Sequence, residues 1–347
     1  MYARRPPPSN QRIILILICI LFGLGLAQYG PALWGNLPQA NFFEQTATWD
    51  QLYASQPDLQ SCQAGQLKNE EQINLLNHIN AIRSLHDLPP LLRDAAGEEA
   101  IAAVALVRAA NAETDNDAPT ERCATGVDKA LDINSLSYQV YQSQVGQGIA
   151  RATLPTSESM IDSLLQDHRR GFNSALWLLN PFAETVRIGR ADGRTDYRRI
   201  ETTTRTGDAT EDQIFFTSQI ALHIELPEER SVDTVPPFIA YPYHDYPQRL
   251  FRKDDHQVGY PHLLFLLPEP QQTVDFAQAQ IEIQDAEGNV VRAQDKDFSA
   301  APTMLGHYLA WQVDDLEPET RYTVKVTNVV VESQPKDYSY WFRLTRE

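Results

Sequence analysis

The sequence LLNHINAIRSLHDLPPL occupies residues 75–91 and sets the pattern for the segments that follow it. Apolar residues within and just before it recur at the spacing of one face of an α-helix. Two consecutive prolines, Pro89 and Pro90, then end the helix, because a proline disfavours helical geometry in the residue before it. We therefore expect a helix over about residues 67–85 that closes on a Pro-Pro turn.

The segments downstream alternate between helical and strand patterns. An alanine-rich stretch over residues 94–111 predicts a second helix with Asp94 as its N-cap. Residues 157–170 predict a further helix, with Ser157 capping it. Residues 184–191 and 212–226 have the composition of strands. Helices combined with a small antiparallel sheet indicate the α+β class.

The order of these features resembles that of the CAP superfamily, which contains cysteine-rich secretory proteins, antigen 5 and plant pathogenesis-related proteins. LNHINAIRSLHDLPPL is similar to the family's first helix, L-N-x-x-N-x-x-R, and to the G-L-x-P-L turn after it. Residues 146–150, 164–169 and 186–189 are similar to its G-E-N-I-A, W-x-x-S-P-x-H-R and V-G-x-G segments. The resemblance covers residues 67–228 and implies a CAP-like α-β-α sandwich there.

Residues 236–347 have a different composition, with short alternating runs separated by turns. In RYTVKV, Tyr322, Val324 and Val326 fall on one face of a strand, and the segment at 285–289 has the chemistry of a hairpin turn. Several short strands of this kind predict a β-sandwich. The segment LEPETRY, which ends at Tyr322, resembles the corner of fibronectin type III and immunoglobulin-like domains. This implies an all-β immunoglobulin-like sandwich with Tyr322 as its corner tyrosine.

An uninterrupted apolar run fills residues 13–27 and follows three arginines. Basic residues before such a run keep the N-terminus in the cytoplasm and send the rest of the chain across the membrane. Extended to Trp34, the run could span a bilayer, and the small residues near its end also fit a cleavage site. Residues 1–34 are therefore either a membrane anchor, spanning with 13–34, or a cleaved signal peptide. Either way the bulk of the protein is extracytoplasmic, and residues 35–66 are expected to be a linker.

Charge and cysteines limit the partners and the compartment. The net charge of −17 repels phosphate, which disfavours nucleic acid as a partner. Cys62 and Cys123 lie in the exported part, where cysteines are more often paired than free. We expect a disulfide between them; two buried free thiols are the alternative.

The CAP cleft, where functional, holds a divalent metal between two histidines and two glutamates. Asp115 and Asp117 stand where the resemblance expects the first histidine, and Gln147 replaces the glutamate of the G-E-N step. His168 matches a cleft histidine and is followed by Arg169. Gln147, His168 and Arg169 are thus the cleft candidates. We expect neither a bound metal nor another cofactor, and assign no catalytic residue.

Other basic and aromatic side chains have structural explanations. Arg83, at the family's arginine position, is expected to bind a carboxylate or a carbonyl within the fold, and His78 and His86 are expected to be solvated. Strand tryptophans usually belong to a core, although a pair could form a carbohydrate-stacking platform. The tryptophans concerned are Trp311 and Trp341, and the tyrosines expected to be exposed are Tyr241, Tyr243 and Tyr246.

A scaffold with an eroded metal tetrad favours binding over catalysis. We expect an exported, cell-envelope-associated CAP-domain protein that is a non-catalytic binding or interaction module with a degenerate metal cleft, for an unidentified envelope or extracellular ligand. The alternative is an extracytoplasmic hydrolase of peptide or envelope polymer, with His168 as general base beside Glu158 or Asp162. In a third interpretation the sandwich binds the ligand and the CAP-like domain is a spacer.

Overall fold

The computed structural model describes most of the chain after residue 45. Its described residues form several sheets and a few helices, which confirms the α+β class. The expected anchor or signal at 1–34 lies outside them, and among them no helix is long and apolar enough to cross a membrane. The described residues are 46–111, 122–124, 127, 135–145, 154–166, 173–195, 213–227, 235–251, 262–268, 272–299, 306–313 and 316–346.

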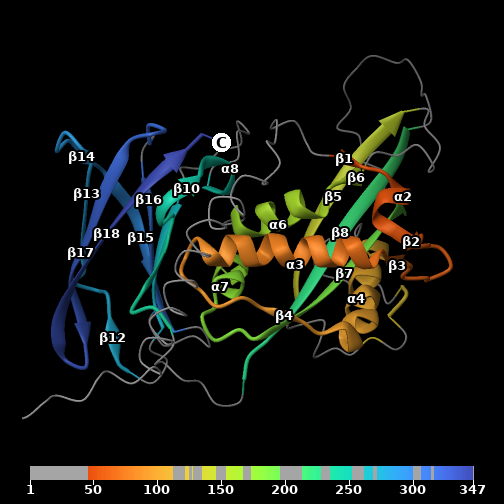
Figure 1. Ribbon diagram of the computed structural model, residues 1–347, viewed down its shortest axis with the longest axis horizontal. Coiled ribbons are helices and arrows are strands. Elements are labelled where there is room, and N and C mark those ends of the chain that lie inside the picture. The colour runs from red at the N-terminus through yellow and green to blue at the C-terminus, as the bar shows by residue number, and fades with distance from the viewer. Residues whose placement is uncertain are drawn as a thin grey trace, which may run out of the picture. The chain divides into compact units, whose positions relative to one another are not determined.

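The first large sheet lies between two layers of helices (Figure 1). In spatial order it contains β4 (Leu92–Arg93), β7 (Thr185–Thr195), β8 (Gln213–Glu225) and β5 (Ser135–Val145). The β4–β7 pair is parallel and the other two pairs are antiparallel. One hydrophobic cluster joins the sheet to α3 (Asn69–Ser84), α6 (Ser157–Gln166) and α7 (Asn173–Leu178), and another joins it to α4 (Glu98–Ala110).

Alternating residues of β7 produce these two layers, because successive side chains of a strand point to opposite faces. Val186 and Ile188 pack with α3, α6 and α7, whereas Ala191 packs with α4. Gly189 also lies on the α4 side, where a Cβ atom would collide with the backbone of Ile101 and the next residue. The missing side chain at position 189 lets α4 approach the sheet closely.

The predicted first and second helices are confirmed. Leu75, Ile79 and Ile82 of α3 are buried, in agreement with the helical spacing. The second helix begins with a 3-10 turn, η1 (Ala95–Gly97), and continues as α4. Asp94 caps the start of η1 by accepting a hydrogen bond from the N–H group of Ala96.

Residues 46–66, which the sequence places in the linker, contain regular structure. They hold β1 (Thr46–Ala47), α2 (Trp49–Leu52) and β2 (Tyr53–Ser55); β1 pairs with β6 (Leu154–Pro155), and β2 pairs with β3 (Gln66–Leu67). Trp49, Leu52 and Tyr53 are buried in one cluster with Phe216 of β8. The polar composition concealed this packing, because a few large side chains supply nearly all the apolar surface.

The chain after residue 236 forms two further sheets. One has the order β10-β18-β17-β13-β14 with β12 also paired to β17, and the other has the order β15-β16-β11-β9. The predicted strands over 262–267, 307–313 and 321–331 are confirmed as β11, β16 and β17. The bounds are β9 Ile239–Tyr241, β10 His244–Pro247, α8 Gln248–Phe251, β11 His262–Leu267, β12 Val274–Asp275, β13 Gln280–Gln284, β14 Val290–Val291, β15 Ala293–Phe298, β16 His307–Val313, β17 Arg321–Val331 and β18 Gln334–Thr345.

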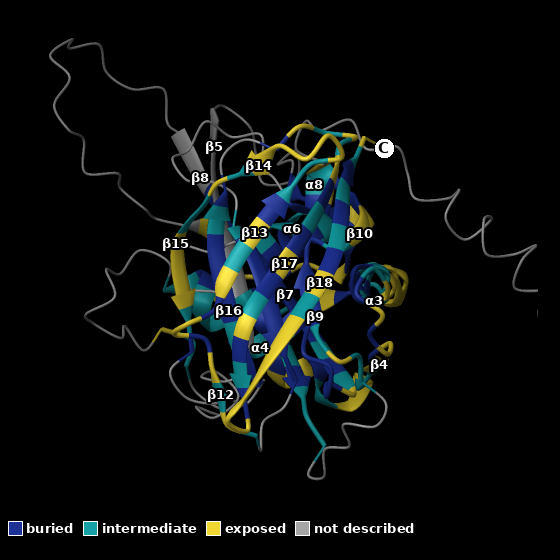
Figure 2. Cartoon of the chain, turned by 90° about the vertical axis from the view of Figure 1, so that its left-hand side faces the viewer, coloured by how far each residue is buried: buried dark blue, intermediate teal, exposed yellow. Residues whose placement is uncertain are grey.

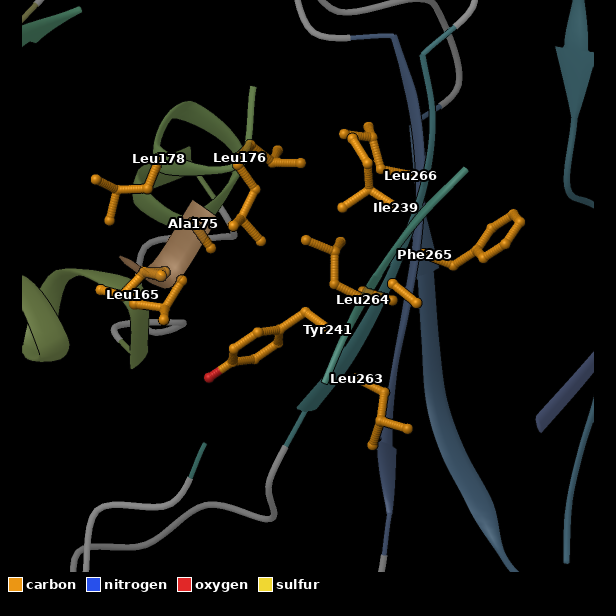
Figure 3. Packing of buried hydrophobic residues seen from close by; sticks show 14 of the residues in the cluster. Leu165, Ala175, Leu176, Leu178, Ile239, Tyr241, Leu263, Leu264, Phe265 and Leu266 are labelled. Carbon is orange, nitrogen blue, oxygen red and sulfur yellow. The ribbon is translucent and has the colours of Figure 1, made fainter. Parts of the chain in front are cut away.

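Strand β11, in the sheet β15-β16-β11-β9, packs between the helical part and the other C-terminal sheet. Its sequence HLLFLL is apolar along nearly its whole length, which is typical of a strand buried on both faces. Leu264, with Tyr241 of β9, lies on the side of Leu165 and Leu176, whereas Phe265 points the opposite way (Figure 3). Helices α3, α6 and α7 and the C-terminal strands therefore share one hydrophobic core.

Tyr322 ties the start of β17 to the turn before it. Its hydroxyl oxygen accepts a hydrogen bond of 2.8 Å from the backbone N–H group of Glu317. Tyr322, Val324 and Val326 are all buried on the same face, which confirms the predicted alternation. The predicted hairpin at 285–289 is also present, as the connection between β13 and β14.

Candidate functional site

The three cleft candidates, Gln147, His168 and Arg169, lie outside the described residues. The same holds for Asp115 and Asp117. The structure does describe several other polar side chains and the groups with which they form hydrogen bonds.

Asp162 of α6 is the carboxylate that the hydrolase hypothesis places beside His168. Its Oδ1 atom lies 2.6 Å from Nε2 of His78 on α3, and its Oδ2 atom accepts a 2.8 Å hydrogen bond from Nη1 of Arg249 on α8. Each of these side chains is at most 18% exposed. The prediction that His78 is solvated was wrong, because α6 supplies a carboxylate for it. Asp162 therefore links three helices.

A buried ion pair lies on β7 at two positions that share one face, Arg190 and Asp192. Nε of Arg190 donates to Oδ2 of Asp192 at 2.7 Å and Nη2 donates to Oδ1 at 3.0 Å, so the pair is bidentate. Both side chains are 0% exposed. Burial by itself would lower the pKa of Arg190, but the negative charge of Asp192 raises it, so the guanidinium stays charged.

Further polar groups extend this pair into a network. Tyr53 donates its hydroxyl hydrogen to Oδ2 of Asp192, and burial together with that carboxylate raises the pKa of Tyr53. Arg190 donates from Nη1 to the hydroxyl of Ser157 at 2.7 Å, and Ser157 donates to Glu71. Burial raises the pKa of Glu71. The network connects β2, β7, α6 and α3, and its sealed ion pair indicates a structural function.

The sequence does contain a signal for this pair. Val186, Ile188, Arg190 and Asp192 follow one another at the two-residue period of a single strand face. Because the first two are apolar and face the core, that period places the two charged residues on the buried side as well. A buried charge requires a partner of opposite charge, and Arg190 and Asp192 are such partners for each other.

Arg83 also acts within the fold, as predicted. Its Nε donates to the carbonyl of Pro89, and its Nη1 donates to the carbonyls of Leu178 and Asn180, each at 2.9 Å. The side chain is 0% exposed, and burial lowers its pKa to about 10. Arg83 thus fastens α3 to the Pro-Pro turn and to the end of α7.

His86 lies at the junction between the helical part and the C-terminal strands. It is 2% exposed, with Nδ1 2.8 Å from the carbonyl oxygen of Ala240 and Nε2 3.2 Å from the hydroxyl of Tyr246. A neutral ring satisfies both contacts, since Nδ1–H donates and Nε2 accepts. Burial, opposed by the hydrogen bond to Ala240 and reinforced by Arg83, lowers the pKa of His86 to about 4.

The structure thereby corrects three expectations of exposure: for His86, Tyr241 and Tyr246. Both tyrosines are 0% exposed, and the hydroxyl of Tyr241 donates to the carbonyl of Leu250 at 2.7 Å. The physical reason is that these rings fill the junction, where only a tertiary contact could bury them. Tyr243 is half-buried.

Acidification should destabilise this junction. Unfolded histidine has a pKa of about 6.5, so the unfolded chain binds more protons than the folded chain between that pH and the folded pKa of about 4. The contribution of His86 to the free energy of unfolding is therefore fully present above about pH 6.5. It falls by about 3 kcal/mol as the pH drops to 4. Urea unfolding at several pH values would measure this loss. In His86→Gln the slope should be smaller; an unchanged slope would contradict the assignment.

Four neighbouring side chains lie on β17, on β18 and at the start of β10, at the edge of the six-stranded sheet; we call Tyr243, His244, Trp341 and Arg321 the aromatic–arginine row. Tyr243 packs against Phe238 and Tyr340, and the other three side chains face outward. The rings of Tyr243 and His244 stack with centroids 3.8 Å apart, and those of His244 and Trp341 are 4.9 Å apart. The Cζ atom of Arg321 lies 4.3 Å from the Trp341 ring centroid. Figure 2 faces this side of β17 and β18, where exposed residues alternate with buried ones.

The two tryptophans considered for a stacking platform therefore lie in different environments. Trp311 of β16 is 0% exposed and belongs to the core. Trp341 is half-buried on the outer face. The sequence could not identify the row, because its members come from segments about a hundred residues apart and neither segment has a distinctive motif.

Cys62 and Cys123 form the predicted disulfide, with Cα atoms 5.2 Å apart. The bridge fastens the segment between β2 and β3 to the chain beyond α4. The alternative of two free thiols is thereby excluded for the folded structure. Such a bond is typical of proteins in an oxidising compartment.

Within the described residues, no group of three or more histidine, cysteine, aspartate or glutamate side chains could hold a metal ion. Comparison with known proteins adds no relative: no family model matches the chain, and no curated protein shows significant similarity to it. The resemblance to the CAP superfamily thus rests on the quoted residues alone and stays a prediction.

Proposed function

We propose that this chain is an exported, cell-envelope-associated protein that binds a ligand and performs no catalysis. Residues 67–228 would be a CAP-like domain with a degenerate metal cleft, and residues 236–347 an immunoglobulin-like sandwich. The helix order α3, α4, α6 around a mostly antiparallel sheet supports the first assignment. The hydrogen bond between Glu317 and Tyr322 supports the second, since a corner tyrosine makes such a bond.

The disulfide supports the extracytoplasmic location. A bond between Cys62 and Cys123 would not persist in a reducing cytoplasm. The apolar run over 13–34 would anchor the protein in the membrane, or direct its secretion if it is cleaved.

The aromatic–arginine row is the single observation that carries the binding function. Large aromatic side chains normally contribute to a core, yet Trp341 and His244 of this row face outward and do not belong to the buried cluster of the same sheet. Aromatic residues and arginine are enriched at binding surfaces. The row therefore favours recognition of another molecule.

The hydrolase alternative is weakened by Asp162. Both of its carboxylate oxygens are already bonded, to His78 and to Arg249. The charge of Asp162 is thereby shared between His78 and Arg249, which makes this carboxylate less available to orient His168 as a general base.

Two assays on the full chain, purified in mild detergent, test the absence of catalysis. Incubation with peptides and peptidoglycan between about pH 4 and pH 9 should release no fragments. Zinc titrated into the protein by calorimetry should give no tight binding. Cleavage that disappears in His168→Ala would contradict the proposal, and tight zinc binding that disappears in the same variant would contradict a degenerate cleft.

A further inference from the structure

We propose that the aromatic–arginine row and the adjacent outer face of β18 and β17 bind an acidic polysaccharide through its carboxylate groups. The inference rests on the proposed binding function and names the site and the ligand class.

The first support is the state of Arg321. Its guanidinium lies over the Trp341 ring, with Cζ 4.3 Å from the ring centroid, and within the described part of the chain it forms no ion pair. Stacking on an aromatic ring leaves the in-plane N–H groups of a guanidinium available. Such a fork matches a carboxylate and can bind it with two parallel hydrogen bonds. Trp341 thus orients Arg321 for a ligand that carries negative charge.

The second support is an unfavourable pairing of like charges. Arg321 and Arg343 lie directly opposite each other on β17 and β18. Like charges in opposite positions destabilise a sheet. Asp245 neutralises Arg343 through a 2.8 Å hydrogen bond from Nε, and the nearby carboxylate of Glu319 accepts from the backbone N–H group of Arg346. Arg321 therefore remains as the cation that an anionic ligand would neutralise.

The charges on β17 and β18 also favour Arg321 as the site for an anion. The whole chain has a net charge of −17. Strands β17 and β18 carry Arg321, Lys325, Lys336 and Arg343 against the acidic residue Asp337, and two of these cations are paired with neighbouring strands, Lys325 with Glu282 of β13 and Arg343 with Asp245 of β10. An anion that approaches this face would therefore meet Arg321, which forms no ion pair within the described residues.

The outer face suits a hydrated polymer better than a peptide. Thr323 lies opposite Trp341, and Ser339 lies opposite Lys325, so hydroxyl groups occupy the positions between the charged and aromatic side chains. Hydroxyl groups, aromatic rings and a guanidinium together match the hydroxyl groups, C–H faces and carboxylates of a sugar acid. A peptide that adds as a strand would use the outer edge of β10 and not the face of the sheet, because β18 is paired on both sides, by β10 and β17.

The test uses polygalacturonate as the probe and the full chain in mild detergent, with affinity measured by calorimetry. The wild-type protein should bind polygalacturonate and should not bind neutral dextran. Arg321→Gln and Trp341→Ala should each weaken binding about tenfold or more, as expected for loss of a charge-assisted hydrogen bond. Arg321→Lys, which keeps the charge and removes the fork, should also weaken binding. The matched control Lys336→Gln, at the far end of β18, should change the affinity by less than about twofold.

Three results would overturn the inference. One is absence of polygalacturonate binding by a wild-type protein that still binds cell envelopes, which would leave the proposed function intact. Another is an equal loss in Lys336→Gln and Arg321→Gln, which would indicate general electrostatic attraction. The third is polyphosphate binding as tight as that of polygalacturonate and unchanged in Trp341→Ala. If Trp341→Ala does not fold, Arg321→Lys and Arg321→Gln decide the outcome.

Discussion

Replacing Asp192 by asparagine is expected to lower the free energy of unfolding by roughly 3–5 kcal/mol. The guanidinium of Arg190 would keep its positive charge in a site with 0% exposure and would lose the negative charge that neutralises it. Removing one member of a buried pair leaves an uncompensated charge, and this cost exceeds that of a lost hydrogen bond. Urea unfolding of the full chain, followed by circular dichroism, would measure the change.

A double variant provides the matched control. Arg190→Met combined with Asp192→Leu removes both charges, so it should be markedly more stable than Asp192→Asn alone. Tyr53→Phe removes one donor to Asp192 and should cost only about 1 kcal/mol. A loss below about 1 kcal/mol in Asp192→Asn would show that water reaches the pair and would contradict the sealed network.

Loss of the disulfide should destabilise the protein by about 4 kcal/mol. Cys62 and Cys123 are 61 positions apart in the sequence, and a crosslink that closes so long a loop strongly restricts the unfolded chain. The double variant Cys62→Ser/Cys123→Ser removes the crosslink without leaving an unpaired thiol. The urea concentration at its unfolding midpoint should fall. The dependence of the unfolding free energy on urea concentration would report any change in the compactness of the unfolded state.

Reduction provides the control for this prediction. Dithiothreitol should destabilise the wild-type protein by a similar amount and should leave the double serine variant unchanged. Mass measurement of protein isolated from cells without reductant should show both thiols oxidised. Two free thiols in that protein would contradict both the bond and the oxidising location that it supports.

Much of the fold was predictable from the sequence, because strong periodicity survives tertiary packing. The helix over 69–84 and the strand over 321–331 bury apolar side chains at a regular spacing, and the strands over 262–267 and 307–313 are short, mostly buried runs. Residues 46–66 were missed because their burial depends on a few aromatic residues that have no period. Trp49 and Tyr53 become recognisable as core only beside Phe216, far along the chain.

The polar sites were less predictable, since their state depends on residues distant in sequence. His86 appeared solvated at the end of an amphipathic helix, yet Ala240 and Tyr246 bury it. Arg83 was predictable as a structural residue, because a long donor side chain next to a tight turn finds carbonyl groups. Arg190 and Asp192 were recognisable from the strand period. The aromatic–arginine row was not, as no local pattern joins β10 to β17 and β18.

Co-sedimentation with cell envelopes tests the central claim most directly. Envelopes from the organism that carries the gene would be incubated with the full chain in mild detergent, and the supernatant assayed for both unbound protein and released peptide or sugar fragments. The account predicts saturable binding to the envelope, equal in wild type and His168→Ala, with no fragments released. Absence of binding, or release of fragments that disappears in His168→Ala, would contradict it.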